Sequence, residues 1–488
     1  MRQPIVHTLN LAHMMPVSAV WAGPEMNRHL NAPPLMMAET RGSTPFRLDL
    51  HVGDVGHTLI VGPTGSGKSV LLALLALQFR RFIGAQVILF DRGRSARAAT
   101  LAMAGDSIEL GLEGTLSLQP LARIDEPGEI ASALQWITAR VTPDVKDAVW
   151  TALQSLASAP RQERTLTGLA VLIQSSALVA ALSPYTLEGP YGRLLDGSSE
   201  QLATTDVLHF EMEQLMQHKA LIAPVLTYLF HRLEGRFDGR PTLLILDEAW
   251  TFLDDALFAA RIREWLKMLR KKNVSVVFAT QSLADIERST IAPALIESCP
   301  TRIFLPNDRA LEPQARSIYE RFGLNARQVE ILGLAAPKRD YYAQTARGNR
   351  LFELGLGPIA LALCGSSSPD DQRLIDRCVA EGERDGFASR FLAAKGLGWT
   401  SELLDRWPRP ASTSAHPQTS HPIDPAEGVP AASAASPASR TPSPKAAARA
   451  VVPRTDPVPL PGLPGGPQMS ERLSPFRIAP GKIKRRGR

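Results

Sequence analysis

The sequence predicts an α/β fold built around a mostly parallel β-sheet, and three observations support this prediction. Short apolar runs typical of buried strands alternate with helical patterns from about residue 52 to residue 393. One run, at residues 58–61, leads into a glycine-rich loop that an apolar helix follows. Another run, at residues 242–246, ends in two adjacent carboxylates, Asp247 and Glu248. Because parallel strands bring such ends to one edge of a sheet, all three observations indicate one architecture.

The glycine-rich loop has the Walker A pattern Gly-x4-Gly-Lys-Ser and predicts a phosphate-binding site. Its glycines let successive backbone N–H groups turn inward toward phosphate oxygens, and the following helix adds the positive end of its dipole. The lysine is expected to reach the β- and γ-phosphates, and the serine hydroxyl is expected to bind Mg²⁺. We therefore expect ATP to be bound by Gly62, Pro63, Thr64, Gly65, Ser66, Gly67, Lys68, Ser69 and Val70.

The two carboxylates at 247 and 248 match the Walker B pattern and predict hydrolysis as well as binding. Asp247 is expected to hold Mg²⁺ together with Ser69, and Glu248 is expected to act as general base on the attacking water. A neighbouring apolar run ends at Ala279 and is followed by Thr-Gln-Ser. An amide at that strand end can contact phosphate and water together, so Gln281 is the predicted sensor. An ordinary polar turn is the alternative interpretation.

Hydrolysis also needs positive charge near the transferring phosphoryl group. Arg270 is the catalytic candidate from a basic cluster, residues 270–272, that ends the helical segment before the 274–279 run. Arg302 is a second candidate. Basic residues at a helix C-terminus also suit the helix dipole, which is the competing interpretation. An arginine that served a neighbouring subunit's nucleotide would make the active form an oligomeric ring.

Five segments are predicted along the chain. Residues 1–50 form a lead-in segment, residues 51–127 and 183–395 form the two parts of a P-loop domain, and residues 128–182 form an all-helical insertion. Residues 396–488 form a disordered basic tail, because Pro, Ala and Ser dominate it and no apolar period survives. Strands are expected at 58–61, 86–90, 206–210, 242–246, 275–279 and 301–305, short antiparallel strands at 339–344, 350–353 and 358–363, and a last helical segment over 370–395.

The composition is that of a soluble globular protein and excludes several classes. Of the 488 residues, 44% are hydrophobic, yet no apolar run is long enough to cross a bilayer, and the N-terminus lacks the pattern of a signal peptide. Three widely spaced cysteines form neither a metal pattern nor a disulfide framework, which favours a cytoplasmic location. The net charge of +6 permits DNA binding without indicating it.

The Walker lysine and aspartate lie 179 positions apart, which suits a RecA-like P-loop NTPase with a helical insertion better than a small GTPase. Further motifs include Phe90-Asp-Arg-Gly-Arg-Ser95, Tyr185-Thr-Leu-Glu-Gly-Pro-Tyr-Gly192 and Trp265-Leu-Lys-Met-Leu-Arg-Lys-Lys-Asn273. With these motifs, residues 5–365 resemble the TrbE-type conjugal transfer ATPases of type IV secretion systems. Arg92 stands where that family's signature has Lys.

The resemblance implies a hexameric ATPase, cytoplasmic or peripheral at the inner membrane, that energises pilus assembly and substrate transfer with other secretion components. It also implies an N-terminal domain ahead of the motor, of which this sequence has almost none, so we expect a truncated or split product or a separately encoded domain. Two alternatives stay open. One is a DNA-translocating ATPase of the coupling-protein or FtsK/HerA type, and the other is a nucleotide-gated assembly scaffold with little turnover.

Overall fold

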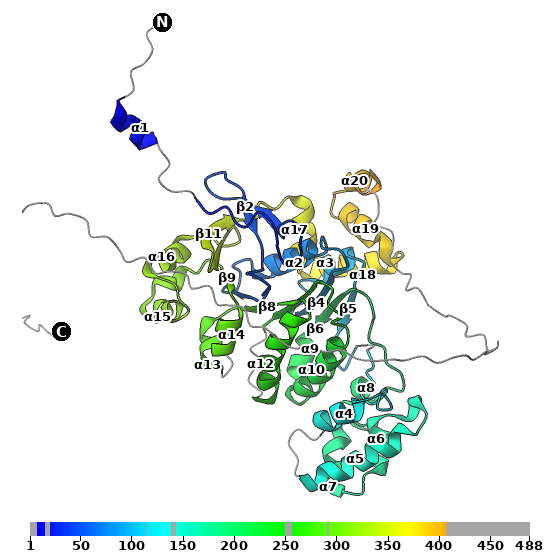
Figure 1. Cartoon of the computed structure of the whole chain (residues 1–488). Helices are drawn as coiled ribbons and strands as arrows, with labels where there is room; N and C mark the ends of the chain where they lie inside the picture. The colour runs from blue at the N-terminus through cyan, green and yellow to red at the C-terminus, as the bar shows by residue number, and fades with distance from the viewer. Residues whose placement is uncertain are drawn as a thin grey trace, which may run out of the picture. The chain divides into compact units, whose positions relative to one another are not determined.

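The computed structural model describes residues 7–14, 20–114, 116–137, 143–248, 256–289 and 292–406, and a nine-stranded sheet lies at its centre (Figure 1). The strand order is β11-β10-β9-β3-β8-β7-β4-β6-β5. Every neighbouring pair from β9 to β5 is parallel, whereas β10 is antiparallel to both β9 and β11. The predicted α/β fold with a mostly parallel sheet is confirmed. The predicted tail lies almost wholly outside the described residues.

The strands of this sheet are β3 (Thr58–Val61), β4 (Gln86–Asp91), β5 (Asp106–Glu109), β6 (Val207–Glu211), β7 (Thr242–Asp247), β8 (Val274–Thr280), β9 (Thr301–Phe304), β10 (Asp340–Thr345) and β11 (Gly348–Glu353). A separate antiparallel pair consists of β1 (Met36–Ala38) and β2 (Phe46–Leu48).

The α-helices before β7 are α1 (Thr8–Met14), α2 (Lys68–Phe79), α3 (Arg97–Ala102), α4 (Glu129–Ile137), α5 (Pro143–Ala157), α6 (Leu166–Leu172), α7 (Ser176–Leu182), α8 (Gly192–Leu195), α9 (Glu213–Gln217) and α10 (Lys219–Glu234). Those after β7 are α12 (Ala256–Lys271), α13 (Leu283–Arg288), α14 (Ala292–Ser298), α15 (Pro313–Arg321), α16 (Ala326–Leu334), α17 (Pro358–Cys364), α18 (Pro369–Ala380), α19 (Phe387–Ala394) and α20 (Thr400–Arg406). Short 3-10 turns are η1 (Arg161–Glu163), η2 (Ser183–Tyr185), η3 (Asp308–Leu311) and η4 (Arg384–Gly386).

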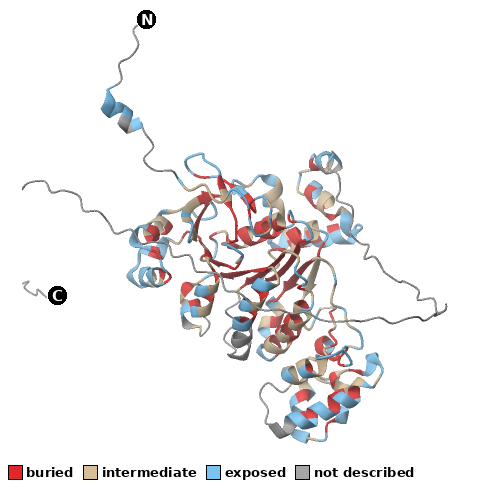
Figure 2. Cartoon of the chain, viewed as in Figure 1, coloured by how far each residue is buried: buried red, intermediate tan, exposed pale blue. Residues whose placement is uncertain are grey.

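Both faces of the parallel sheet are buried, which explains why its strands read as continuous apolar runs. Along β7, Leu243 and Ile245 join one core cluster, while Leu244 and Leu246 join the cluster on the opposite face. The first face is covered by α2, α3 and α17, and the second by helices that include α10 and α12 (Figure 1). Figure 2 shows the buried residues concentrated along the central strands. The sheet therefore forms the middle layer of three.

One predicted strand is wrong: residues 358–363 lie in helix α17 instead of a third antiparallel strand. Gly357 precedes the helix, and Pro358 takes the first helical position, where a missing N–H costs nothing. The remaining residues, Ile-Ala-Leu-Ala-Leu, form a helix as readily as a strand, and the segment packs against α2. A short apolar run without a clear period does not distinguish the two structures.

Other elements were missed or merged. Strand β5 at the sheet edge is only half-buried, and its sequence Asp-Ser-Ile-Glu carries little apolar signal. Strands β1 and β2 are three residues each within the predicted lead-in segment. The single helical segment expected over 370–395 is two helices, α18 and α19, separated by a turn containing Gly382 and Gly386.

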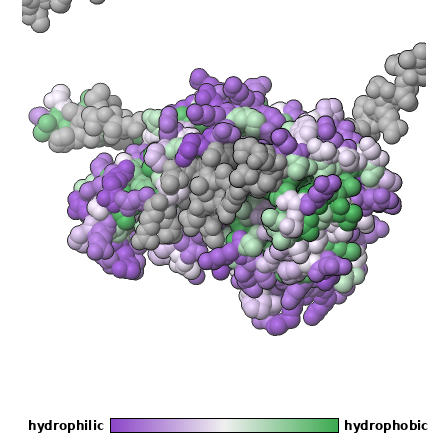
Figure 3. Space-filling model, turned by 90° about the horizontal axis from the view of Figure 1, so that it is seen from below, coloured by the Kyte–Doolittle hydropathy of each residue, from purple (hydrophilic) through white to green (hydrophobic). Residues whose placement is uncertain are grey.

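Between β5 and β6 no described residue lies in a strand, and helices α4 to α8 occupy this stretch. Its boundaries as a separate insertion stay a prediction. Some of its apolar side chains face solvent, among them Val171 at 80% exposure and Leu187 at 70%. The view from below shows apolar residues gathered on part of that face (Figure 3). No helix among the described residues is long and apolar enough to span a membrane.

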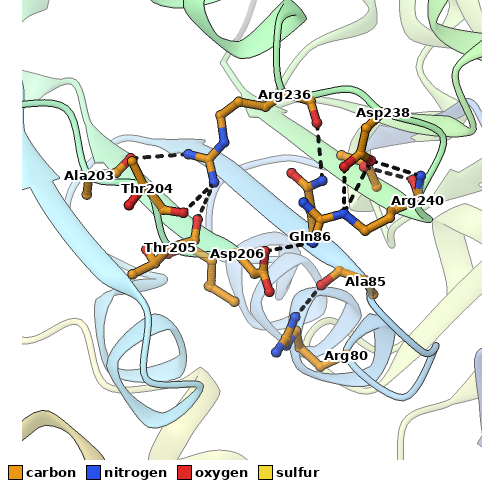
Figure 4. A network of polar contacts seen from close by, with 12 residues as sticks. Arg80, Ala85, Gln86, Ala203, Thr204, Thr205, Asp206, Arg236, Asp238 and Arg240 are labelled. Carbon is orange, nitrogen blue, oxygen red and sulfur yellow. Dashed lines mark hydrogen bonds and ion pairs between the residues drawn. The ribbon is translucent and has the colours of Figure 1, made fainter. Parts of the chain in front are cut away.

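Two arginines hold the amino ends of β4, β6 and β7 (Figure 4). Arg236 donates to the carbonyl oxygens of Ala203 and Thr204 at 3.1 and 3.0 Å, just before β6. Arg240 pairs with Asp206 at 3.0 Å and with Asp238 at 2.9 Å. Charged groups at this edge thus satisfy loop carbonyls and one another.

His57 enters β3 as a buried neutral imidazole. Its Nε2–H donates to the carbonyl oxygen of Leu266 at 3.0 Å, and its Nδ1 accepts from the amide of Val276 at 3.2 Å. Burial lowers the pKa of His57 to about 4, although the hydrogen bond to Leu266 acts in the opposite direction. The unfolded chain therefore binds a proton at this residue between about pH 6.5 and pH 4, whereas the folded chain does not.

We predict that His57 makes the folded state less stable as the pH falls through this window. The loss should reach about 2 kcal/mol at pH 5 relative to pH 7, because the unfolded state alone is protonated there. Urea denaturation of the native chain and of His57→Gln at both pH values measures it. The variant keeps a donor but does not titrate, so its stability should fall less. An equal pH dependence in the two proteins would contradict a neutral buried His57.

Candidate functional site

The glycine-rich loop joins β3 to α2 and depends on glycine for two reasons. Gly65 and Gly67 adopt φ angles of +80° and +103°, in the region that side chains disfavour. Gly67 also leaves no room, since an added Cβ would lie 2.7 Å from the hydroxyl oxygen of Tyr341. At Gly62, an added Cβ would lie 2.6 Å from the Cβ of Leu305. Both the backbone conformation and the packing of neighbouring strands therefore fix the loop.

Helix α2 begins at Lys68 and has no side-chain cap at its N-terminus. The first N–H groups of a helix lack intrahelical partners, so they can serve an anion. The amide of Gly62 donates to the carbonyl oxygen of Thr280 at 3.1 Å, which anchors the start of the loop to the end of β8. The loop thus places uncapped amides at the carboxyl edge of the parallel sheet.

Lys68 contacts both predicted carboxylates. Its Nζ donates to Asp247 Oδ1 at 2.6 Å and also to Glu248 Oε1. The side chains of Lys68, Asp247 and Glu248 are 7%, 6% and 15% exposed, so the three charges are largely shielded from water. The structure therefore brings together the lysine and the acid pair that the sequence predicted as neighbours.

Glu248 has a φ of +54°, which is unusual for a residue with a side chain. Its amide donates to the carbonyl oxygen of Ala279 and to Asp247 Oδ1, each at 3.1 Å. These contacts hold the chain in a sharp turn where β7 ends. Strained residues of this kind cluster at functional sites, because the surroundings must compensate for the strain.

Burial raises the pKa of Asp247 to about 6, even though the Lys68 ammonium lowers it. The carboxylates of Asp91 and Glu248 add to the rise. Negative charge is thus concentrated at the ends of β4 and β7, a position that favours a cationic partner.

Gln281 follows β8, and its Oε1 accepts a hydrogen bond from the hydroxyl of Thr64 in the glycine-rich loop. The predicted sensor therefore reaches the same site as Lys68. Its catalytic role stays a proposal.

The two predicted arginines do not reach this site within the chain. Arg270 makes two hydrogen bonds of 2.8 Å to Asp54, which precedes β3, so both residues lie at the amino edge of the sheet. Arg302 donates to the carbonyl oxygens of Phe322 and Ile296 at 2.8 and 2.9 Å. Both guanidinium groups are engaged in contacts that hold the fold together.

A cavity of about 810 Å³ opens over the loop, a size suited to a nucleotide. The predicted residues that line it are Pro63, Thr64, Gly65, Gly67, Lys68, Ser69, Val70, Asp247, Glu248 and Gln281. Sequence reasoning missed Arg92, Gly93, Glu213, Lys338, Arg339, Tyr341, Glu353, Leu354, Gly355, Leu356 and Leu361. Arg92 follows the end of β4, so the rule that identified Gln281 could have found it. The residues beyond 337 come from the antiparallel edge and carry no motif.

Comparisons with known proteins agree with this architecture. Residues 172–344 match the family described as the TraG P-loop domain. The chain is 46% identical over 421 residues to the conjugal transfer protein TrbE of Rhizobium radiobacter, covering 83% of this chain and 51% of that protein. It is also 46% identical over 421 residues to a probable conjugal transfer protein TrbE of Sinorhizobium fredii, covering 83% and 63%. The chain thus spans between half and two thirds of these relatives.

A solved structure, VirB4 of Thermoanaerobacter pseudethanolicus, superposes with a TM-score of 0.54 at 18% identity. The match covers 67% of this chain and 97% of that one. At this identity the likeness concerns the fold alone.

We predict that Gly67→Ala destabilises the protein more than Gly65→Ala. Both substitutions place a side chain at positive φ, at a cost of about 1–2 kcal/mol. Only at Gly67 does the new methyl collide with Tyr341, which adds about 1–3 kcal/mol of overpacking, whereas at Gly65 nothing lies within 4 Å. Urea denaturation without nucleotide measures the two losses. In a Tyr341→Phe background the difference should shrink, and equal losses in the native background would contradict the packing argument.

Proposed function

The chain belongs to the TrbE/VirB4 family of conjugal transfer proteins, and we propose that it is an ATP-hydrolysing motor that energises conjugal transfer through a type IV secretion system. The contact of Lys68 with Asp247 and Glu248 beside the uncapped N-terminus of α2 carries this proposal. It supplies, within one cavity, a cation for phosphate, a carboxylate for a metal ion and a second carboxylate for water.

The phosphates of ATP are held in this proposal by Lys68 and by the amides of residues 62 to 70. A polyphosphate offers Lys68 an alternative anionic partner, which leaves the two carboxylates free to act on other groups. Asp247 and the Ser69 hydroxyl are hard oxygen donors at the cavity wall and fit Mg²⁺. When bound there, Mg²⁺ would neutralise negative charge on the phosphates.

Glu248 is the proposed general base. Its carboxylate accepts a proton from a water molecule, whose oxygen forms a bond to the γ-phosphorus. The bond between that phosphorus and the β–γ bridging oxygen breaks, which yields ADP and inorganic phosphate, and the proton is then released to solvent. The strained turn at Glu248 supports this role, because it fixes the backbone of the residue beside the buried Asp247.

Gln281 is proposed to orient the water or to sense the γ-phosphate, and its contact with Thr64 supports this role. The family further supports a hexamer that works with other secretion components, located in the cytoplasm or peripherally at the inner membrane. Where the motor acts in transfer, and on which substrate, belongs to the same proposal.

We predict that the native chain hydrolyses ATP in a manner that rises cooperatively with protein concentration, as expected of an oligomer. Glu248→Gln should bind ATP and hydrolyse it at least about 100-fold more slowly, because the amide cannot accept the proton. Lys68→Ala should lose most of the ATP binding. Phosphate release and binding of a fluorescent ATP analogue measure both effects. Glu320→Gln, on the exposed surface of α15, is the matched control and should remain active.

Equal activity in the native chain, Glu248→Gln and Lys68→Ala would exclude this site as the source of hydrolysis. A native chain that binds ATP without turnover would instead favour a nucleotide-gated scaffold.

A second prediction separates a secretion motor from a DNA translocase. The hydrolysis rate should not change on addition of double- or single-stranded DNA. Stimulation by DNA that weakens steeply between about 50 and 200 mM salt would support a translocase. Steady-state rates across a salt series, with and without DNA, decide between the two.

A further inference from the structure

Positive charge inside the cavity comes from residues other than the two arginines predicted from the sequence. Its basic lining residues are Lys68, Arg92, Lys338 and Arg339. Lys68 contacts the Walker B carboxylates, and Arg339 donates to Glu353 at 2.7 Å. Within the described part of the chain, the side chains of Arg92 and Lys338 form no hydrogen bond or ion pair. Two cations of the cavity are therefore available to a ligand.

The turn that carries Arg92 is held by two buried carboxylates. Asp91 accepts hydrogen bonds from the Ser95 hydroxyl at 3.0 Å and from the amide of Ala96 at 2.9 Å. Glu211, 2% exposed at the end of β6, accepts from the amide of Gly93 at 3.0 Å. These bonds fix the backbone on both sides of residue 92. The position of the Arg92 backbone is thus as well determined as that of the strands beside it.

The sheet places this turn beside the proposed base. Strand β4 pairs in parallel with β7, and Phe90 lies opposite Leu246. Residues 91 and 92 therefore follow β4 at the level where Asp247 and Glu248 follow β7. In the strand order β3-β8-β7-β4, Lys68 approaches the carboxylates from the side of β3, and Arg92 approaches from the side of β4.

Lys338 lies on the opposite side of the phosphate loop. Its amide donates to the carbonyl oxygen of Ser66 at 2.8 Å, and its chain leads into β10 at the antiparallel edge. Its backbone thus lies on the side of the loop away from β7 and Glu248. Arg92 is the cation adjacent to the strand that carries the base.

We propose that Arg92 is a catalytic residue that acts in cis, donating hydrogen bonds to the γ-phosphoryl oxygens of the ATP bound by its own chain. The inference rests on the proposed ATPase function. As the bond to the leaving ADP breaks, negative charge on the equatorial oxygens and the leaving oxygen is met by Arg92 from one side and by Lys68 from the other. The role that the sequence assigned to Arg270 is thereby filled from within the chain.

The first test compares Arg92→Gln and Arg92→Lys with the native chain. Removal of the charge should lower kcat on the order of 10²–10³-fold, as loss of one transition-state donor does elsewhere. The Kd for a fluorescent ATP analogue should change less than about 5-fold, because the contact strengthens only in the transition state. Arg92→Lys should recover part of kcat, since it restores the charge without the planar fork of donors. Thermal denaturation should show the same Tm for all three proteins.

Two control variants accompany this test. Arg347→Gln removes an exposed arginine in the β10–β11 turn, which does not line the cavity, and should leave kcat unchanged. Lys338→Gln removes the other available cation of the cavity and should lower kcat far less than Arg92→Gln. Equal losses in Lys338→Gln and Arg92→Gln would overturn a specific role for Arg92.

A mixing experiment distinguishes action in cis from action on a neighbouring subunit. Arg92→Gln chains keep Lys68, and Lys68→Ala chains keep Arg92. If Arg92 served the neighbour's ATP, mixed oligomers would regain activity, because a Lys68→Ala chain would complete the site of its Arg92→Gln neighbour. Action in cis predicts an activity no higher than the sum of the two variants.

The results separate this inference from the function on which it rests. An active native chain with an unchanged kcat in Arg92→Gln would overturn the role of Arg92 and leave the ATPase proposal intact. Activity restored by mixing would overturn action in cis. A native chain without any hydrolysis would overturn both.

Discussion

The contact of Lys68 with Asp247 and Glu248 is the interaction on which the rest of the site depends. It joins the first turn of α2 to the end of β7, which lie 179 residues apart in the chain. Burying three charges is costly unless each has a partner, so the strand order must bring β3 and β7 within reach. Strand β8 lies between them, and its end supplies the carbonyl oxygens that receive the amides of Gly62 and Glu248. The parallel sheet is thus the scaffold of one charge cluster.

The two edges of this sheet use charge differently. At the amino edge, Arg236, Arg240 and Arg270 bind loop carbonyls or carboxylates, and these contacts fix where the strands begin (Figure 4). At the carboxyl edge, carboxylates hold the turns, and basic groups remain available to the cavity. An arginine before a parallel strand is therefore expected to be structural, whereas one directly after a strand is a candidate for chemistry. That distinction follows from strand direction alone.

Much of the fold and of the site could be predicted from residues whose signal is local. The apolar runs of β3, β4 and β7 and the Walker patterns of Lys68 and Asp247 identify themselves, because burial on both sheet faces and phosphate binding each demand particular residue types. What failed depends on tertiary context. The order of strands decides that Arg270 lies at the far edge and Arg92 at the near one. Packing against α2 decides that residues 358–363 form a helix. The positive φ of Glu248 has no sequence signature at all.

The same energetics that hold the cluster together also make it suited to exchange of partners. A buried ion pair gains Coulomb energy roughly equal to the desolvation it costs, so its net contribution is small while the penalty for an unpaired charge is large. A phosphate group that replaces the carboxylates at Lys68 therefore costs little, provided that Asp247 and Glu248 obtain a cation or a proton in return. The raised pKa of Asp247 reflects that requirement, because burial and its carboxylate neighbours already press it toward a positive partner. Arg92, fixed on the other side of the same carboxylates, provides positive charge that does not depend on Lys68. The turn after β4 and the phosphate loop are in this sense two halves of one electrostatic site, joined through the end of β7.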